Sequence, residues 1–437
     1  MMFPLEGAPP DLEASWCQNC FGCSFTNVSF GHAFDMILLR HFRHQSSSLE
    51  CAASRLYFAF PFRKKKNHQP YLEVWTGNQW LRFPIRGEQS LQQSLDAKIS
   101  VNNQQNNDEE NDGFPDSPNG NMQMDRWTDE PLSGEELTQL LLHNSNDDDD
   151  DAATTKEGPS DDHDPVALRQ LATALQVGRN PARFILLNTK SHKVVALAPC
   201  SVHLWSTDDR IVIMDIDGSI TKSNVFGLID TLVTEAYSYC HDGVCQFLSQ
   251  LLREGTGQIP HSGGELRILY LTSRPLVLSN FTRKFLTNVQ QIEGNGSLST
   301  LPDGPLLGYS GSLSNILHME LITHSVHEFK HQAIKDNVLT PWAQLGQMDL
   351  PFWAALGNTW MDIQAYQAIG IPLARLGFIT KKSIIHVLRS PMPPLQSPML
   401  SLYPPTTPPE PDAEHSFESF RDPGLLQYFR QRDVQAT

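Results

Sequence analysis

A continuous apolar run that ends in two carboxylates restricts this chain more than any other feature. Residues 211–214 read Ile-Val-Ile-Met, and Asp215-Ile216-Asp217-Gly218 follow at once. An unbroken apolar run of this kind is typical of a strand covered on both faces in a parallel sheet. Similar runs occur at 266–275, 350–360 and 371–379, with helical periodicity at 226–254 and 277–289 between them. Buried strands that alternate with helices predict an α/β domain whose site lies at the carboxyl ends of the strands.

The two carboxylates at the end of the first run point to a bound cation. Asp215 and Asp217 stand at i and i+2, where they would repel each other unless a positive charge lay close by. Mg²⁺ takes oxygen ligands and keeps positions for a substrate phosphate. Gly218 permits a sharp exit from the strand, and the main-chain amides after it, at Ser219, can cradle phosphate oxygens.

Polar side chains also follow the next two strand-like runs. Thr272 and Ser273 end the second run, and a threonine hydroxyl there can donate to a phosphoryl oxygen. Asn358 and Asp362 follow the third run, four residues apart at the start of an expected helix. Each signal alone marks an ordinary turn, but three of them at successive strand ends predict one site.

The rest of the chain divides into four further segments. Residues 29–87 alternate apolar and polar residues in short aromatic and β-branched runs, which predict an antiparallel sheet or half of a β-sandwich. Residues 88–164 are too polar and acidic to repay the entropy of folding and are expected to be a disordered linker. Residues 165–208 read as further strands, 209–390 as the α/β domain, and the proline-rich 391–437 as a disordered tail.

Composition limits the class of protein. The formal net charge is −16, and residues 101–164 hold 19 acidic against two basic residues, so the remainder is close to neutral. Seven cysteines is a low and odd number, which argues for reduced thiols. No apolar run approaches the roughly 20 residues of a membrane-spanning helix, and the first residues do not read as a secretion signal. We therefore expect an intracellular protein that contacts membranes only at their surface.

The order of the three motifs is similar to that of the haloacid dehalogenase superfamily, and the segments around them resemble one family within it, the lipins. The resemblance is carried by Leu204-Trp205, RIVIMDIDGSITKSNVFG, LYLTSRP, LPDGPLL at 301–307 and PFWAALGNTWMD, and it covers about 168–385. A fainter similarity to the lipin amino-terminal region runs over 31–86. The resemblance over 168–385 implies a Rossmann-like parallel sheet with helices on both faces. It also implies a small immunoglobulin-like β-sandwich built jointly from the amino-terminal and pre-catalytic strands.

The resemblance further implies a Mg²⁺-dependent phosphatidate phosphatase that converts phosphatidic acid to diacylglycerol. Asp215 would be the nucleophile, and Asp217 the general acid and base. Thr272 and Lys330 would bind and balance the phosphoryl charge, with Gly218, Ser219 and Ser273 around the phosphate. Asp215, Asp217, Asn358 and Asp362 would hold the Mg²⁺ ion.

Two departures from the family pattern keep other hypotheses open. Family members carry two lysines and a proline shortly before the Phe-Lys pair, whereas this chain has His324-Ser325-Val326 before Phe329-Lys330. Ser219 stands in the place of a threonine and keeps its hydroxyl. The alternatives are a catalytically weak phosphatidic-acid sensor and a phosphoprotein phosphatase of the haloacid dehalogenase type. Retention of both Asp215 and Asp217 argues against the sensor.

Partner and location follow from the same resemblance. The basic run Arg63-Lys64-Lys65-Lys66 is either a solvated hairpin turn or a contact for anionic lipid. Phosphatidic acid in a membrane is the expected partner, and no nucleic acid is expected. The expected location is the cytoplasm, peripherally at the endoplasmic reticulum or the nuclear membrane, and such a basic run also fits a nuclear address.

Overall fold

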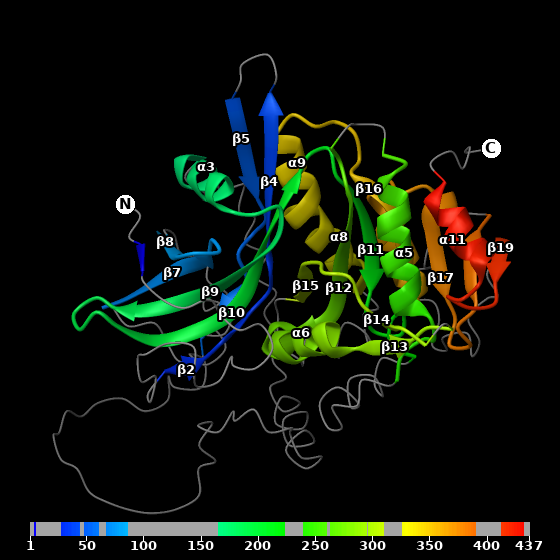
Figure 1. The fold of residues 1–437 in the computed structure, drawn as a ribbon, viewed down its shortest axis with the longest axis horizontal. Coiled ribbons are helices and arrows are strands. Elements are labelled where there is room, and N and C mark those ends of the chain that lie inside the picture. Colours follow the sequence, from blue (N-terminus) through cyan, green and yellow to red (C-terminus); the bar gives the residue numbers. More distant parts are fainter. Residues whose placement is uncertain are drawn as a thin grey trace, which may run out of the picture.

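A computed structural model describes residues 4–5, 28–43, 48–60, 67–85, 165–222, 239–259, 263–294, 296–309, 326–389 and 412–431. The basic run 63–66, the expected linker 88–164 and residues 391–411 lie outside these ranges. The described chain forms two sheet-based bodies that lie side by side (Figure 1).

The first body is an eight-stranded sheet. Its strands are β1 (Pro4–Leu5), β2 (Ser29–Phe30), β4 (Met36–Arg43), β5 (Ser48–Ala53), β7 (His68–Trp75), β8 (Trp80–Pro84), β9 (Gly178–Asn188) and β10 (Lys193–Ser206). They run in the order β1-β8-β7-β9-β10-β4-β5, with β2 beside β10. A short ladder joins β3 (His32–Ala33) to β6 (Phe58–Ala59).

This sheet contains both amino-terminal strands and the strands that precede β11 (Arg210–Asp215). Strand β9 pairs with β7, and β10 pairs with β4, across more than a hundred residues of sequence. The sheet is mixed rather than antiparallel, because β10 runs parallel to both β2 and β4. Residues 165–174 differ from the expectation of strands: they form helix α3 (Pro165–Ala174), whose Leu168 and Leu171 belong to the sheet's core, as does Leu175 just after the helix.

The second body is a seven-stranded sheet in the order β15-β12-β11-β16-β17-β18-β19. These strands are β11 (Arg210–Asp215), β12 (Leu266–Pro275), β15 (Leu306–Tyr309), β16 (Phe352–Gly357), β17 (Leu376–Ile379), β18 (Ile385–Leu388) and β19 (Ala413–Phe417). The first five strands are parallel, and β18 and β19 are antiparallel additions. The expected α/β class, with its apolar runs as central parallel strands, is confirmed.

Helices cover both faces of this sheet. They are α5 (Val244–Thr256), α6 (Ser279–Asn288), α8 (Val326–Ile334), α9 (Thr340–Gln344), α10 (Trp360–Ala368) and α11 (Pro423–Arg430). Shorter elements are the turns η3 (Leu276–Leu278) and η6 (Leu373–Arg375), the π-helical turn η5 (Lys335–Leu339), and the hairpin of β13 (Gln290–Ile292) and β14 (Leu298–Thr300).

Strand β11 shows why its apolar run is unbroken. Val212 and Met214 belong to the core that includes α5, whereas Ile211 and Ile213 belong to the core that includes α8 and α10. Because successive side chains of a strand point to opposite faces, a strand covered on both faces needs an apolar residue at every position.

Residues 412–431 correct part of the expected disordered tail, 391–437. Strand β19 extends the second sheet beside β18, and α11 packs against α5 (Figure 1). Phe429 is fully buried, and its main-chain oxygen accepts a hydrogen bond from the Trp353 indole at 2.7 Å.

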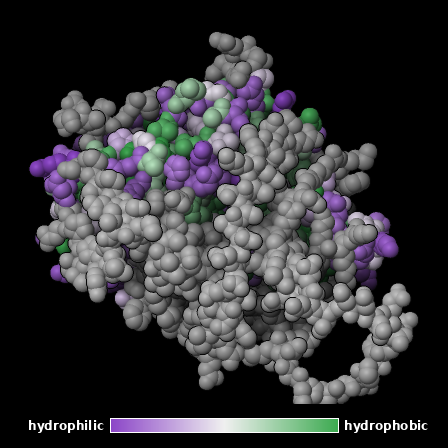
Figure 2. All heavy atoms as spheres, turned by 180° about the vertical axis from the view of Figure 1, so that it is seen from behind, coloured by the Kyte–Doolittle hydropathy of each residue, from purple (hydrophilic) through white to green (hydrophobic). Residues whose placement is uncertain are grey.

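None of the described helices has the length and apolarity that crossing a bilayer requires. On the face shown in Figure 2, the described residues form a mixed surface in which a hydrophobic group is bordered by hydrophilic side chains.

Candidate active site

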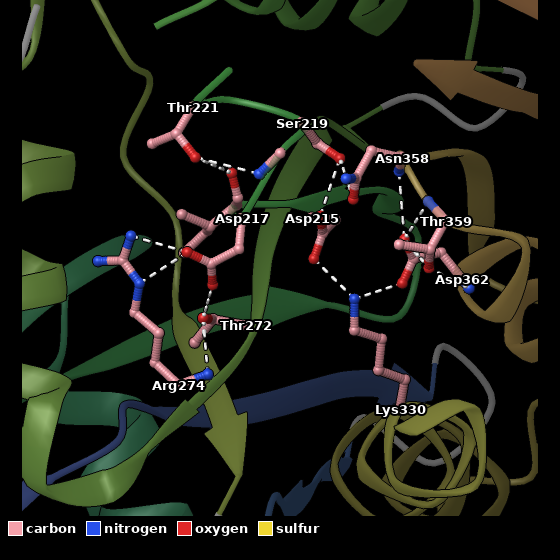
Figure 3. A network of polar contacts seen from close by, with 12 residues as sticks. Asp215, Asp217, Ser219, Thr221, Thr272, Arg274, Lys330, Asn358, Thr359 and Asp362 are labelled. Carbon is pink, nitrogen blue, oxygen red and sulfur yellow. Dashed lines mark hydrogen bonds and ion pairs between the residues drawn. The ribbon is translucent and has the colours of Figure 1, made fainter. Parts of the chain in front are cut away.

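The polar residues expected at three strand ends come together in one buried cluster (Figure 3). Asp215 ends β11, Thr272 lies near the end of neighbouring β12, and Asn358 follows β16 on the other side of β11. Parallel strands bring their carboxyl ends to the same edge, so the order of the sheet places these residues around Asp215. Helices α8 and α10 add Lys330 and Asp362 to the cluster.

Lys330 lies between two carboxylates. Its ammonium contacts Oδ1 of Asp215 at 2.7 Å and also donates to Oδ1 of Asp362. All three side chains are at least 95% buried. Removing one partner of such a buried ion pair leaves a charge without compensation, so these three residues depend on one another.

Burial and charge set the proton affinities of this cluster. Burial raises the pKa of Asp215 to about 7, and the nearby carboxylates of Asp362 and Asp217 act in the same direction, against the lowering effect of Lys330. Burial works against the charge on Lys330, but Asp215 and Asp362 outweigh it and raise its pKa above its ordinary value. Lys330 is therefore a fixed positive charge at any pH near neutrality.

Asp217 faces a different set of donors. Its Oδ2 accepts from the Thr272 hydroxyl at 2.6 Å, and its Oδ1 accepts from Nε of Arg274 at 2.8 Å. The Arg274 side chain is 4% exposed, and its guanidinium reaches the Thr282 hydroxyl of α6. The carboxylates of Asp215 and Asp217 are thus held by separate cations, which lets two acidic groups share one buried site.

The loop after Asp217 is folded tightly. Gly218 has φ of 88°, a left-handed conformation that suits glycine, and its N–H donates to Oγ1 of Thr221 at 3.0 Å. The Ser219 hydroxyl turns back and donates to Oδ2 of Asp215 at 2.8 Å. Ser273, by contrast, is half-buried, and no hydrogen bond joins it to the other site residues of the described chain.

Asp362 both caps helix α10 and contacts Lys330. Its Oδ2 accepts from the N–H of Thr359 at 2.9 Å, and its own N–H donates back to the Thr359 hydroxyl at 3.2 Å. This reciprocal pair is a capping box, which starts helix α10 at the strand end. The same contacts leave Oδ1 facing Lys330 (Figure 3).

Asn358 lies beside oxygen atoms of Asp215 and Asp217, the kind of ligand that a divalent cation takes. The Asn358 amide can be placed two ways. The orientation that satisfies its hydrogen bonds turns the amide nitrogen toward β11, where it donates to the main-chain oxygen of Asp217 at 3.0 Å and to Oδ2 of Asp215 at 3.2 Å; the opposite orientation would turn the amide oxygen toward both. Carboxylate, carbonyl and amide oxygens are the ligands that Mg²⁺ prefers. Within the described ranges, no three His, Cys, Asp or Glu side chains gather for a metal by themselves.

The four residues expected to hold the metal therefore differ in which of their oxygen atoms lie close together. The Asn358 amide lies next to Oδ2 of Asp215 and the main-chain oxygen of Asp217. The carboxylate of Asp217 lies with Thr272 and Arg274, and that of Asp362 lies with Thr359 and Lys330, so neither carboxylate faces Asn358 as Oδ2 of Asp215 does. The metal assignment remains a prediction.

The sequence alone does not reveal the role of Arg274. It lies two residues beyond Thr272, so strand periodicity could have placed both on one side, but spacing alone did not reveal that Asp217 is its partner. Thr221 and Thr359 were also missed, because their role depends on the turns in which they lie.

This region of the chain is similar in sequence to known proteins. Residues 166–392 match the family model described as LNS2 (Lipin/Ned1/Smp2). Human phosphatidate phosphatase LPIN1 is 28% identical over 211 residues, which are 48% of this chain and 21% of that protein. Nuclear elongation and deformation protein 1 of Schizosaccharomyces pombe is 30% identical over 213 residues, 49% of this chain and 29% of that protein.

A third relative is phosphatidic acid phosphohydrolase 1 of Saccharomyces cerevisiae, 28% identical over 219 residues, which are 49% of this chain and 23% of that protein. The chain thus spans less than a third of the length of each of these relatives. The family model, however, covers more than half of the chain, including every residue of the cluster around Asp215. This chain belongs to the lipin family, LNS2 (Lipin/Ned1/Smp2).

Proposed function

We propose that this chain is a Mg²⁺-dependent phosphatidate phosphatase, which hydrolyses phosphatidic acid to diacylglycerol and phosphate through an aspartyl-phosphate. The observation that carries this proposal is the buried cluster in which Asp215 is held by Lys330 and Ser219 while Asp217 has its own donors. The names of the relatives, phosphatidate phosphatase and phosphatidic acid phosphohydrolase, support the choice of substrate.

In the first step, a carboxylate oxygen of Asp215 attacks phosphorus, and the bond from phosphorus to the glycerol oxygen breaks. Asp217 gives its proton to that oxygen, so diacylglycerol leaves as an alcohol. Lys330 stabilises the negative charge that develops on the phosphoryl oxygens, and a donor aimed at such charge is among the larger catalytic contributions.

In the second step, Asp217 takes a proton from water, and the resulting hydroxide attacks the phosphorus of the aspartyl-phosphate. The bond to Asp215 breaks, and phosphate leaves. Thr272 and Arg274, which hold Asp217 in the structure, become donors for phosphoryl oxygens when Asp217 turns toward the leaving group.

Asp215, Asn358 and the main-chain oxygen of Asp217 would hold the Mg²⁺ ion. The ion, when bound, would supply positive charge that brings phosphoryl oxygens close to Asp215. Its charge would also favour the ionised, nucleophilic form of Asp215, whose pKa burial raises.

Fold and location belong to the same proposal. We assign the seven-stranded body to the haloacid dehalogenase type, on the order of its motifs at β11, β12 and β16. We assign the eight-stranded body with its β3–β6 ladder to an immunoglobulin-like sandwich. A lipid substrate requires peripheral membrane contact from the cytoplasm, at the endoplasmic reticulum or nuclear membrane. The basic run 63–66, one proposed contact, lies outside the described residues.

The deciding experiment is phosphate release from vesicles that contain phosphatidic acid, with and without Mg²⁺. Asp215→Asn serves as the inactive control, and a soluble phosphopeptide serves as the competing substrate. We expect Mg²⁺-dependent release from the lipid that Asp215→Asn abolishes. Release from the phosphopeptide alone would favour a protein phosphatase, and vesicle binding without release would favour a phosphatidic-acid sensor.

A further inference from the structure

A buried histidine outside the cluster contacts the loop that joins Asp215 to Ser219. The segment 239–241 runs beside 220–222: the His241 N–H donates to the oxygen of Ile220 at 2.9 Å, and the Lys222 N–H donates to the oxygen of Tyr239 at 3.1 Å. His241 is fully buried. Its Nε2 lies 3.1 Å from the main-chain oxygen of Gly218.

The partners of the imidazole fix its tautomer. A carbonyl oxygen can only accept, so Nε2 carries the proton and donates to Gly218. Burial lowers the pKa of His241, so the ring is neutral at neutral pH and Nδ1 is an acceptor. The hydroxyl of Ser383, 2.7 Å away, therefore donates to Nδ1.

Ser383 adopts a backbone conformation that serine rarely takes. Its φ is 68°, in the turn between β17 and β18, where its N–H donates to the oxygen of Thr380 at 2.9 Å. Glycine would adopt this conformation without strain but would have no hydroxyl. Strain of this kind is retained where a side chain is needed.

We propose that His241 and Ser383 are a pair of positioning residues that hold the loop 216–219, which joins Asp215 to Ser219, in the conformation that the reaction needs. His241 anchors the carbonyl of the peptide between Gly218 and Ser219, and Ser383 keeps the imidazole in the donating tautomer. On one side of this peptide stands Asp217, and on the other Ser219, whose hydroxyl binds Oδ2 of Asp215 at 2.8 Å. By fixing this peptide, the pair sets the positions of the Asp215 and Asp217 carboxylates without contacting substrate. This inference rests on the proposed phosphatase function.

Three variants separate a positioning role from a structural one. In His241→Gln, the amide nitrogen reaches the position of Nε2 and can still donate to Gly218, whereas His241→Leu keeps bulk and loses the donor. We expect His241→Leu to lower kcat for phosphatidic acid about ten- to a hundredfold, with KM little changed, because a small misplacement of reacting groups has effects of this size. We expect His241→Gln to recover most of the loss.

Ser383→Gly tests the second member of the pair. It relieves the left-handed strain, so we expect the melting temperature to stay at or above that of the unmodified chain. Activity should nevertheless fall about fivefold, the effect of one neutral hydrogen bond. Equal kcat in Ser383→Gly and the unmodified chain, or equal losses in His241→Gln and His241→Leu with both folded, would overturn the proposal.

A measurement without turnover keeps this inference distinct from the proposed function. In the full chain with ¹⁵N-labelled histidine, the nitrogen shifts of His241 report which ring nitrogen carries the proton. We expect protonation at Nε2 alone at neutral pH, and a proton at Nδ1 would refute the pair. Absence of phosphate release by the unmodified chain, with Nε2 protonated, would refute the phosphatase and leave the contact intact.

Discussion

Lys330 is the side chain on which the site's charge balance depends. Its ammonium is the one described cation that contacts both Asp215 and Asp362. We expect Lys330→Met to lower kcat by about a hundredfold or more, because a donor aimed at transition-state charge is lost. Steady-state phosphate release, with circular dichroism to confirm folding, measures this change.

Lys335 is the matched control for that substitution. It lies on the same helical stretch, five residues on, but it is exposed. Lys335→Met should therefore leave kcat nearly unchanged. If Lys330→Met kept its activity while the unmodified chain was itself barely active, the chain would be better explained as a phosphatidic-acid sensor.

Single residues were predictable where a motif follows a buried strand. Asp215 and Asp217 stand directly after β11, and Thr272 lies near the end of β12, so their meeting follows from the parallel order of the strands. Lys330 could be placed only by family resemblance, since nothing in its local sequence links it to β11. The contacts of Arg274 and His241 could not be foreseen, because side-chain direction and loop packing depend on tertiary structure.

At the scale of elements, α11 shows how composition can mislead. The prolines before it suggested a disordered tail, but residues 422–430 carry the signals of a helix. Asp422 is the N-cap and accepts from the N–H of Gly424, and Pro423 occupies the first turn, where it is tolerated. Leu425 and Phe429, four residues apart, form its buried face.

We predict that α11 contributes substantially to stability. Phe429→Ala should lower the free energy of unfolding by about 3–5 kcal/mol, because it leaves a cavity between α11, Phe247 and Trp353. Gln427→Ala, on the exposed side of the same helix, should change it by less than about 0.5 kcal/mol. Urea titration of both variants measures the difference, and similar values for the two would show that α11 is not anchored.

For the whole molecule, one carboxylate joins the two bodies. Asp35, just before β4, accepts from the N–H of Ser201 at 2.7 Å and from the N–H of Leu306 at 2.8 Å, and it pairs with Arg283 at 3.0 Å. Burial alone would raise the pKa of Asp35, but Arg283 and these N–H donors outweigh it and lower the pKa. The ionised form of Asp35 therefore stabilises the folded chain.

This pairing predicts a dependence of stability on pH. Because the pKa of Asp35 is lower in the folded state, its contribution is full above the unfolded value of about 3.8 and is lost as the pH falls below it. Asp35→Asn should therefore be less stable than the unmodified chain at pH 7, and the difference should shrink below about pH 4. A constant difference from pH 7 to pH 3, measured by urea unfolding, would contradict this assignment.

The last prediction concerns the covalent link between the amino-terminal strands and the rest. Strand β7 pairs with β9, and β4 pairs with β10, so the first body is completed only by strands from both sides of residues 88–164. Strand pairing and buried side chains, rather than the intervening chain, should hold these parts together. The entropy of closing a loop depends only weakly on its length, so a long connection contributes little to holding its two ends in place. We therefore expect that a chain cut at a protease site introduced within 101–162 will stay together, elute as one species and keep its phosphate release.

The Asp35 contacts allow a sharper form of this test. In the cut chain, Asp35→Ala leaves the Ser201 and Leu306 N–H groups and the Arg283 guanidinium without their shared acceptor, and buried donors without partners are costly. The two pieces should then separate at a lower urea concentration than in the cut chain with Asp35. Asp208→Ala, at an exposed position whose side chain accepts a hydrogen bond from the Ser206 hydroxyl, is the matched control and should not change that concentration. Separation of the pieces in native buffer without any substitution would mean that the shared sheet is weaker than its strand pairing indicates.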